Sequence, residues 1–171
     1  MIDGIVTRVT SGDTIHLITP VKRRLCAQPY GIDAPEIDTL HEPNGESRNE
    51  EQPYAQESLK TLEDKVLAQK VYLGDIDMNK QKRFVGIIFP GRPNINMEMA
   101  RDGHAEVFPE GSRQPYRSKF LNAEREALSV KREIWSLPVY ERPLVFRKRM
   151  NIRDGEQAGR LPDLAGLPGN G

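Results

Sequence analysis

The sequence is poor in cysteine, carries no net charge and has no long hydrophobic run. Cys26 is its single cysteine, so the chain forms no internal disulfide, and its cysteine content indicates neither an oxidising nor a reducing compartment. No apolar run approaches the roughly 20 residues that a membrane-spanning helix needs, so we expect no membrane span. No basic and then apolar leader of the signal-peptide type precedes the first predicted strand.

The charged residues balance overall but are unevenly distributed. The 25 basic and 25 acidic side chains give a formal net charge of zero, which excludes the chain-wide positive charge of many nucleic-acid-binding proteins. Residues 36–51 nevertheless hold six acids and one arginine, whereas residues 142–153 hold four arginines, one lysine and no acid. Any contact with a polyanion is therefore expected at a local basic region.

A single domain is expected, because 171 residues suffice for one hydrophobic core. Alternating apolar residues predict strands, and apolar residues spaced three or four apart predict helices. The predicted strands are two within residues 2–18 and one each over 25–32, 70–73 and 83–89, and the predicted helices cover 53–66, 95–102 and 116–131. Residues 37–52 lack periodicity and are predicted to be a loop. We place the domain at residues 1–137 and a basic, proline- and glycine-rich C-terminal extension at residues 138–171.

The residues best suited to metal binding or catalysis are acids in predicted turns. Asp33 and Glu36 flank Pro35, which stiffens the turn after a predicted strand, and Asp13 lies in another turn beside a strand. Carboxylates and carbonyls are ligands for hard cations such as calcium, and the planar fork of Arg83 suits phosphate oxygens. Two acids for a metal, a third acid as base and an arginine together indicate metal-assisted phosphodiester hydrolysis. Each acid taken singly is more often a turn cap or solvated surface.

Six segments carry a more specific signal. In order they are V-T-S-G-D-T-I-H-L, Y-G-I-D-A-P-E, Q-P-Y-A-Q-E-S-L, K-R-F-V-G-I-I-F, N-M-E-M-A-R-D-G-H-A and K-R-E-I-W-S. Over about residues 5–136 the chain resembles the thermonuclease (staphylococcal nuclease-like) family in their order and spacing. The resemblance implies an α+β, mainly β fold, a five-stranded oligonucleotide-binding (OB-fold) barrel with three helices. It also implies calcium-dependent, largely sequence-nonspecific cleavage of DNA and RNA.

The family resemblance also implies roles for individual residues. Asp13, Asp33 and the backbone carbonyl of Ala34 would hold Ca²⁺, and ligation through the backbone explains why an alanine is acceptable there. Glu36 would activate the attacking water. Arg83, together with the metal, would stabilise the charge of the transition state.

Two positions near the implied metal site depart from the family pattern. The family has an arginine five residues before Asp33, where it holds the scissile phosphate, and this chain has Gln28 there. Glutamine donates a hydrogen bond but brings no charge. Arg24 could replace the family arginine only if its strand is irregular. Ser11 stands where relatives commonly carry another acid.

The implied substrate contacts differ in part from those of the family. Lys80 matches a basic family position and is a candidate contact for a terminal phosphate. Residues 109–111 are Pro-Glu-Gly where the family has tyrosines that stack on a bound base, and Phe108 and Tyr116 are the aromatic residues that could compensate. Since such stacking contributes roughly 1–3 kcal/mol per base, we expect weaker or different nucleotide binding.

Two functions therefore stay open from the sequence. The first is a calcium-dependent nuclease, favoured by Asp13, Asp33, Glu36 and Arg83. The second is a catalytically weakened or inactive nuclease-like barrel that binds nucleic acid or a protein partner, favoured by Gln28. DNA or RNA is the expected partner and a monomer the expected state. Because family members are often exported, the chain is expected to be exported if a leader has been removed, and otherwise cytoplasmic.

Overall fold

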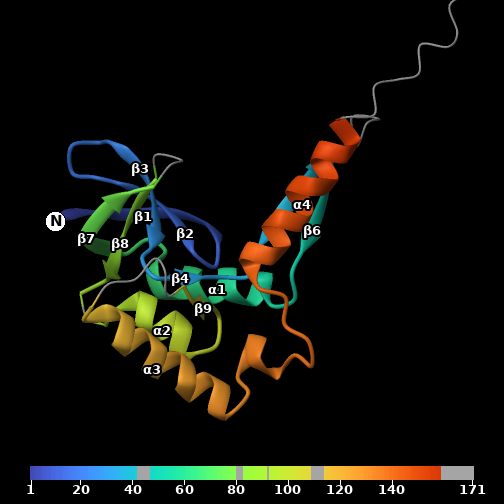
Figure 1. Ribbon diagram of the computed structural model, residues 1–171. Coiled ribbons are helices and arrows are strands. Elements are labelled where there is room, and N and C mark those ends of the chain that lie inside the picture. The colour runs from blue at the N-terminus through green and yellow to red at the C-terminus, as the bar shows by residue number, and fades with distance from the viewer. Residues whose placement is uncertain (42–46, 80–82, 92, 109–113, 159–171) are drawn as a thin grey trace, which may run out of the picture.

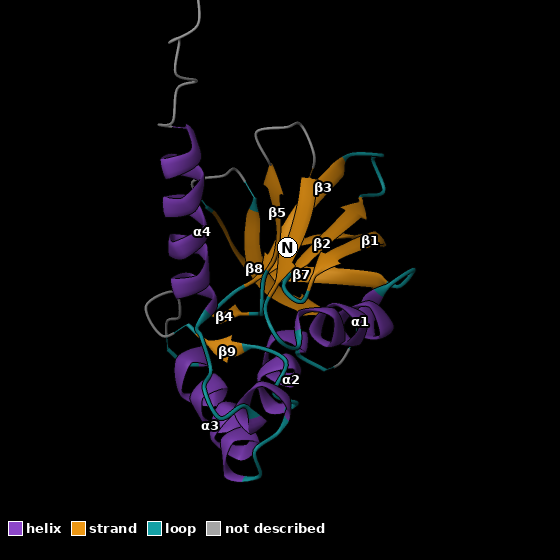
Figure 2. Ribbon diagram, turned by 90° about the vertical axis from the view of Figure 1, so that its right-hand side faces the viewer, coloured by secondary structure: helices purple, strands orange, loops and turns teal. Residues whose placement is uncertain are grey.

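Five strands close into a barrel (Figures 1 and 2). The computed structural model describes residues 1–41, 47–79, 83–91, 93–108 and 114–158, and for residues 38–41, 47–49 and 151–158 it describes the backbone alone. In spatial order the strands are β1 (Ile2–Ser11), β2 (Thr14–Ile18), β3 (Arg24–Pro29), β8 (Phe84–Phe89) and β7 (Lys70–Met78). Neighbouring strands are antiparallel except β3 and β8, which are parallel. The barrel confirms the fold class expected from the sequence.

The barrel interior is filled by the alternating apolar residues that predicted the strands. Ile15 and Leu17 of β2 are at most 1% exposed, and Val71 and Leu73 of β7 are fully buried. Each such side chain contributes about 1.5–3 kcal/mol relative to an exposed one. Successive side chains of a strand point to opposite faces, so His16 lies on the outer face of the barrel, where it is half-buried.

Three helices cover one end of the barrel, as expected, and a fourth lies to its side (Figures 1 and 2). The three are α1 (Ala55–Val66), α2 (Ile95–Arg101) and α3 (Tyr116–Ser129). The Asn94 side chain accepts a hydrogen bond from the Met97 amide and so caps the N-terminus of α2. A short 3₁₀ helix, η2 (Glu133–Ser136), precedes α4 (Pro143–Ala158), a helix that was not among the three predicted ones.

A short strand pair leads the chain away from the barrel at the candidate site. The strand predicted over residues 25–32 ends at Pro29. A turn follows at Gly31, whose φ of 74° is a value that favours glycine. The chain then forms β4 (Ile32–Asp33), which pairs with β9 (Glu106–Val107) and not with a barrel strand.

The buried Asn96 holds this turn against the barrel. Its side-chain nitrogen donates hydrogen bonds to the carbonyl oxygens of Tyr30 at 2.9 Å and Gly86 at 3.0 Å, and its oxygen accepts one from the Ile88 amide at 3.0 Å. A buried amide with these partners satisfies backbone groups that the ladder leaves unpaired. The position of the residues that follow, β4 included, is therefore fixed relative to β8.

The segment predicted to be a loop is largely a hairpin. β5 (Ile37–His41) pairs antiparallel with β6 (Ser47–Glu51). The loop prediction for residues 37–52 was wrong because backbone pairing does not require hydrophobic alternation, which was the signal that the prediction depended on. Figure 1 shows α4 running beside β6, and Arg149 of α4 forms an ion pair with Glu50 of β6 at 2.9 Å.

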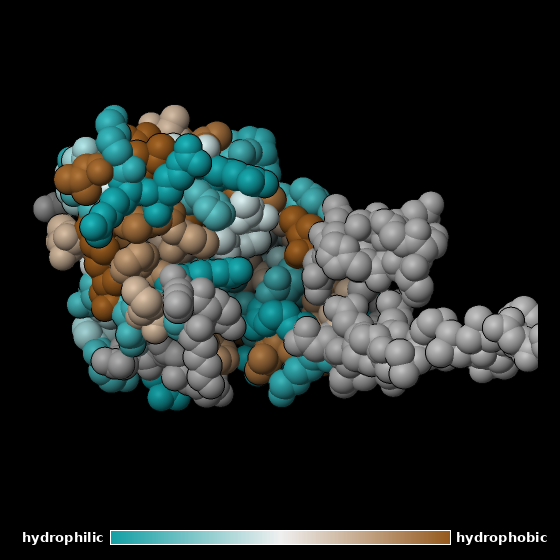
Figure 3. Space-filling model, turned by 90° about the horizontal axis from the view of Figure 1, so that it is seen from above, coloured by the Kyte–Doolittle hydropathy of each residue, from teal (hydrophilic) through white to brown (hydrophobic). Residues whose placement is uncertain are grey.

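The described surface has a mixed character. Seen from above, hydrophilic and apolar side chains are interspersed over the barrel (Figure 3). Exposed large apolar side chains include Val21, Val130 and Val139, and single residues of this kind are normal on a protein surface. Within the described ranges, no helix has the length and apolar character needed to cross a membrane. The monomeric state stays a prediction.

Candidate active site

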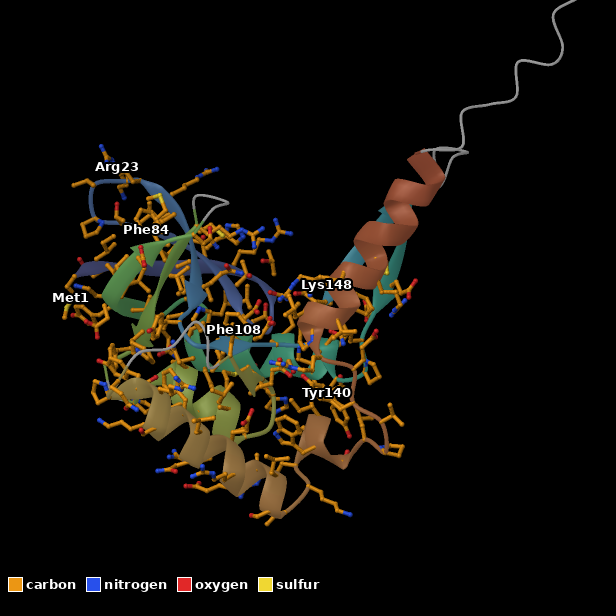
Figure 4. The ribbon with its side chains drawn as sticks, viewed as in Figure 1. Met1, Arg23, Phe84, Phe108, Tyr140 and Lys148 are labelled. Carbon is orange, nitrogen blue, oxygen red and sulfur yellow. The ribbon has the colours of Figure 1, made fainter. Side chains whose placement is uncertain are left out.

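A cavity of about 750 Å³ brings together five of the side chains predicted from the sequence. The five are Asp13, Gln28, Asp33, Glu36 and Arg83. They come from the β1–β2 turn, from β3, from β4 and the residues after it, and from the residue that precedes β8. Phe108, labelled near the middle of Figure 4, lines the same cavity, as does Arg147 of α4. The cavity therefore combines acids, a neutral amide and two guanidinium groups.

Asp13 is held in the β1–β2 turn by three hydrogen bonds. Its Oδ1 accepts from Ser11 Oγ at 2.8 Å and from Thr14 Oγ1 at 3.3 Å. Its Oδ2 accepts from the Ala34 amide at 3.2 Å, which ties the turn to the segment that carries the other acids. Ser11, where the family commonly has an acid, thus positions Asp13 directly.

The backbone of Glu36 is fixed by Gln52. The Glu36 amide donates to Gln52 Oε1 at 3.0 Å, and the Gln52 amide donates to the Glu36 carbonyl oxygen at 2.9 Å. Gln52 is 5% exposed, and its Nε2 donates to the Glu141 carbonyl oxygen at 2.7 Å, near the start of α4. The position of Glu36 therefore depends on the segment that leads into α4.

Arg147 of α4 reaches into this group of acids. Its Nη1 donates to Asp33 Oδ1 at 2.9 Å and its Nη2 donates to Asp33 Oδ2 at 2.8 Å. Nη1 also donates to Glu36 Oε1. The hydrogen bonds to Asp33, and then those to Glu36, raise the pKa of Arg147 further above its ordinary value. The guanidinium is therefore a permanent positive charge at the two acids.

Two of the acids are harder to ionise than usual. Burial, and next the charge of Asp13, raise the pKa of Glu36 to about 7 against the opposing effect of its contact with Arg147. Burial, and next the charge of Asp33, raise the pKa of Asp13. Both raised pKa values mean that the surroundings do not fully stabilise the negative charges of these two carboxylates. An added cation therefore favours the ionised forms.

The donor chemistry of the site fits a hard divalent cation. Asp13, Asp33 and the carbonyl of Ala34 would offer oxygen ligands only, which suits calcium or magnesium. Over the ranges described, no three His, Cys, Asp or Glu side chains form a group arranged to hold a metal ion. The predicted set has only two carboxylates, and both oxygens of Asp33 already accept from Arg147. A cation at Asp33 would therefore meet the guanidinium at the same oxygens.

Gln28 belongs to a chain of neutral hydrogen bonds. Asn79 Nδ2 donates to Gln28 Oε1 at 2.9 Å, and Asn79 Oδ1 accepts from the Arg83 amide at 2.9 Å. Arg24, the alternative cation considered for this wall, begins β3 and is not among the residues that line the cavity. Between the gaps in the described chain, no acidic side chain pairs with the guanidinium of Arg83, which lines the cavity. As far as the structure describes it, this wall thus offers the guanidinium of Arg83 without an acidic partner and one neutral amide.

The remaining predicted substrate contacts are placed differently. Lys80 and residues 109–111 lie outside the described residues. Tyr116 lines a separate cavity of about 510 Å³ together with Tyr30. Of the two aromatic candidates, only Phe108 therefore lies at the candidate site.

Arg147 and Gln52 are two of the site residues that could not be identified from the sequence. The signal for Arg147 was the basic run over residues 142–153, which does not show which of its arginines faces the acids. Gln52 gave no signal, because its role depends on hydrogen bonds to two distant backbone segments.

Comparison with known proteins agrees with this geometry. Residues 28–137 match the family described as "Staphylococcal nuclease homologue". The chain is 30% identical over 156 residues to "Endonuclease YhcR" of Bacillus subtilis (strain 168), an alignment that covers 86% of this chain and 13% of that protein. It is 29% identical over 137 residues to "Probable endonuclease LCL3" of Komagataella phaffii, covering 76% and 53% of the two chains.

A third relative is an "Uncharacterized endonuclease" of Haemophilus influenzae, 26% identical over 131 residues, which are 77% of this chain and 65% of that protein. The chain spans less than two thirds of the length of each of these relatives. The family match covers more than half of the chain and includes Gln28, Asp33, Glu36 and Arg83. This chain therefore belongs to the staphylococcal nuclease homologue family.

Proposed function

We propose that this chain is a nuclease that hydrolyses phosphodiester bonds of DNA and RNA, uses Ca²⁺ and has little sequence preference. The observation that carries the proposal is the convergence of Asp13, Asp33, Glu36 and Arg83 in one cavity. The relatives named above are all called endonucleases, which supports the same reaction class. Nucleases of this family are generally metal-dependent, and oxygen-only ligands favour calcium within that group.

The side chains of the cavity divide the chemistry among them. Glu36, whose ionised form an added cation would favour, accepts a proton from the attacking water. Arg83 donates hydrogen bonds to phosphate oxygens, where its charge stabilises the transition state. Asp13, Asp33 and the carbonyl of Ala34 would hold the metal, which would supply positive charge to stabilise the transition state.

A second candidate is a nuclease-like barrel that binds nucleic acid or a protein partner without efficient cleavage. One observation favours it: Arg147 engages both Asp33 and Glu36, so an acid assigned to the metal and the acid assigned to the water are both occupied. The neutral Gln28 points in the same direction, because it adds no charge for a phosphate.

The test is incubation of the purified chain with plasmid DNA and with a labelled single-stranded oligonucleotide, in Ca²⁺, in Mg²⁺ or in chelator. We expect cleavage in Ca²⁺ that chelator stops. Glu36→Gln, which keeps the size of the side chain and an acceptor for Arg147, should lower the rate by about 10²-fold or more. Glu57→Gln removes an exposed acid from the first turn of α1 and serves as the matched control. Retarded bands without cleavage under every condition would favour the second candidate.

A further inference from the structure

We infer that Arg147 of α4 is a substrate-binding residue that supplies the second guanidinium for the scissile phosphate. The inference rests on the proposed function and adds to it a residue from outside the barrel. It assigns to α4 a part in the chemistry, although the sequence placed residues 138–171 outside the domain. The observations that carry it are the position of the guanidinium, the attachment of the helix and the charge balance of the cavity.

The guanidinium lies at the two acids that the proposed reaction uses. Arg147 contacts Asp33, proposed to hold the metal, and Glu36, proposed to activate the water. In the proposed reaction, a phosphate would have to reach both of these carboxylates, because one would hold the metal and the other would activate the water. The Arg147 side chain is 38% exposed and lines the cavity, so it is accessible from the space that substrate would occupy. Its planar fork matches two phosphate oxygens as well as it matches a carboxylate.

Helix α4 is attached to the domain by contacts that do not involve Arg147. Arg142 forms an ion pair at 2.9 Å with Glu106 of β9, whose side chain is 4% exposed. Arg149 pairs with Glu50 of β6 at 2.9 Å and with Glu141 at 3.0 Å. These residues lie before and after Arg147 on the chain, so the backbone of Arg147 stays near the cavity when its own side chain changes partner.

Two apolar side chains add to this attachment. Phe146 is 1% exposed and Met150 is fully buried, and the guanidinium of Arg149 lies 4.9 Å from the centre of the Phe146 ring. Residues four apart lie on one face of a helix, so these two define the buried face of α4. A helix that buries such a face is a fixed part of the fold and not a solvated tail.

The charges in the cavity favour an exchange of hydrogen-bond partners by Arg147 when substrate binds. Asp13, Asp33 and Glu36 are three acids, and among the described residues Arg147 is the cation that forms ion pairs with two of them, Asp33 and Glu36. If Asp13 and Asp33 held a divalent cation, their charge would be balanced, and Asp33 would bind the guanidinium less tightly. A phosphate brings negative charge into the same space, and the neutral Gln28 cannot balance it. Arg147 then exchanges carboxylate oxygens for phosphate oxygens, beside Arg83.

The same contacts allow a different role, which the test must separate. If Arg147 only occupied the place of the metal, it would inhibit the reaction. Its removal would then leave the rate at saturating metal unchanged or higher. If it binds phosphate, its removal lowers that rate. The two roles therefore predict opposite changes in the same measurement.

The first measurement is the rate of cleavage of a labelled single-stranded oligonucleotide at saturating Ca²⁺. Arg147→Gln should lower kcat by roughly 10²–10³-fold, and Arg147→Lys, which keeps the charge but not the fork, should lower it less. Lys148→Gln removes one positive charge from the neighbouring, exposed position of α4 and is the matched control. It should change the rate far less than Arg147→Gln. Circular dichroism of each variant shows whether the fold is kept, and Arg147→Lys keeps the inference testable if Arg147→Gln does not fold.

The second measurement is binding without cleavage. In a Glu36→Gln background, fluorescence anisotropy gives the Kd of the same oligonucleotide with Ca²⁺ and with chelator. Adding Arg147→Gln should weaken binding about 10-fold in Ca²⁺ and less in chelator, where Asp33 still occupies the guanidinium. A merely structural role of Arg147 would weaken binding equally under the two conditions.

The outcomes separate this inference from the function on which it rests. A wild-type protein that cleaves nothing in any metal overturns both. A wild-type protein that cleaves, while Arg147→Gln cleaves as fast or faster, overturns the role of Arg147 alone. Equal losses in Arg147→Gln and Lys148→Gln overturn it too, because the effect would then be one of general charge. Calcium-dependent cleavage with a selective loss in Arg147→Gln supports both.

Discussion

At the scale of single residues, each acid of the cavity has its own support. Asp13 accepts three hydrogen bonds from its turn and from Ala34, Asp33 is paired with Arg147, and Glu36 is fixed through its backbone. These supports do not remove the cost of burying the acids and of placing them together, which is why the pKa values of Asp13 and Glu36 are raised. The ionisation of the site is therefore coupled to folding.

The raised pKa of Glu36 makes the stability of the metal-free protein depend on pH. The folded chain keeps the Glu36 proton up to about pH 7, whereas the unfolded chain loses it near the ordinary value of 4.5. Glu36 thus contributes stability that is fully present below about pH 4.5 and is lost as the pH rises through about 7. We expect this group to lower the free energy of unfolding by up to about 3 kcal/mol over that window.

Urea denaturation in chelator, at a series of pH values, measures this effect. Glu36→Gln should remove that part of the decline, while the contribution from Asp13, which has the same sign, stays. The same decline in wild type and variant would mean that Glu36 ionises normally in the folded chain.

Gln28 and Arg147 line the same cavity, so a charge placed at one position can replace a charge lost at the other. Gln28→Arg alone should raise the rate little, because Arg147 already supplies a guanidinium. In an Arg147→Gln background, Gln28→Arg should recover about 10-fold of the lost rate, limited by the hydrogen bond that Asn79 now gives to Gln28. Rates of the two single variants and the double variant at saturating Ca²⁺ measure the coupling. Strictly additive effects would show that the positions act independently.

At the scale of elements, the sequence predicted what a periodic burial pattern makes visible. The barrel strands and helices α1, α2 and α3 each bury one regular face, so alternation or helical spacing identified them. The hairpin of β5 and β6 is defined by backbone pairing, which leaves no such pattern. Helix α4 was missed because basic residues surround its buried positions, Phe146 and Met150.

The same difference between local and long-range patterns explains which residues of the candidate site could be predicted. Asp13, Asp33, Glu36 and Arg83 were identified because short motifs in and beside the barrel carry them. The contact of Arg147 with Asp33 joins residues 114 positions apart. A contact of that separation depends on where α4 packs, and no local pattern reports it.

Helix α4 is anchored at its start by Arg142, and this anchor can be tested by stability. Glu106 is almost fully buried, and burial raises its pKa while Arg142 opposes the shift. Arg142→Ala leaves that acid without this ion pair, and because Arg142 itself is 46% exposed we expect a loss of about 1–3 kcal/mol, less than for a fully buried pair.

Urea denaturation measures this loss. Glu106→Gln should make the subsequent Arg142→Ala substitution much less costly, since no buried charge is then stranded. An equal cost in both backgrounds would show that the Arg142 contact with Glu106 does not hold the helix.

At the scale of the whole molecule, the two charged blocks of the sequence meet in space. Residues 36–51 hold six acids and one arginine, and residues 142–153 hold five basic residues and no acid. Arg149 pairs with Glu50 and Arg147 contacts Glu36, so part of each block neutralises the other. The basic block is therefore not a free polycation. Helix α4 contributes to nucleic-acid binding only through basic side chains whose ion pairs with acids can break.

This neutralisation predicts a small salt dependence for binding through α4. Each phosphate contact contributes about 0.9 to the slope of log K against log salt concentration for duplex DNA. In the Glu36→Gln background with Ca²⁺, Arg147→Gln should reduce the slope by about 0.9, the value for one contact. Arg149→Gln should reduce it less, because Glu50 and Glu141 already occupy that guanidinium.

Anisotropy titrations of a short duplex at four or more salt concentrations give these slopes. Equal reductions for Arg147→Gln and Arg149→Gln would mean that the whole basic face of α4 releases its acids and binds the duplex backbone. A reduction confined to Arg147→Gln would mean that the helix presents a single guanidinium to the nucleic acid, from a surface whose other charges are used to hold the helix in place.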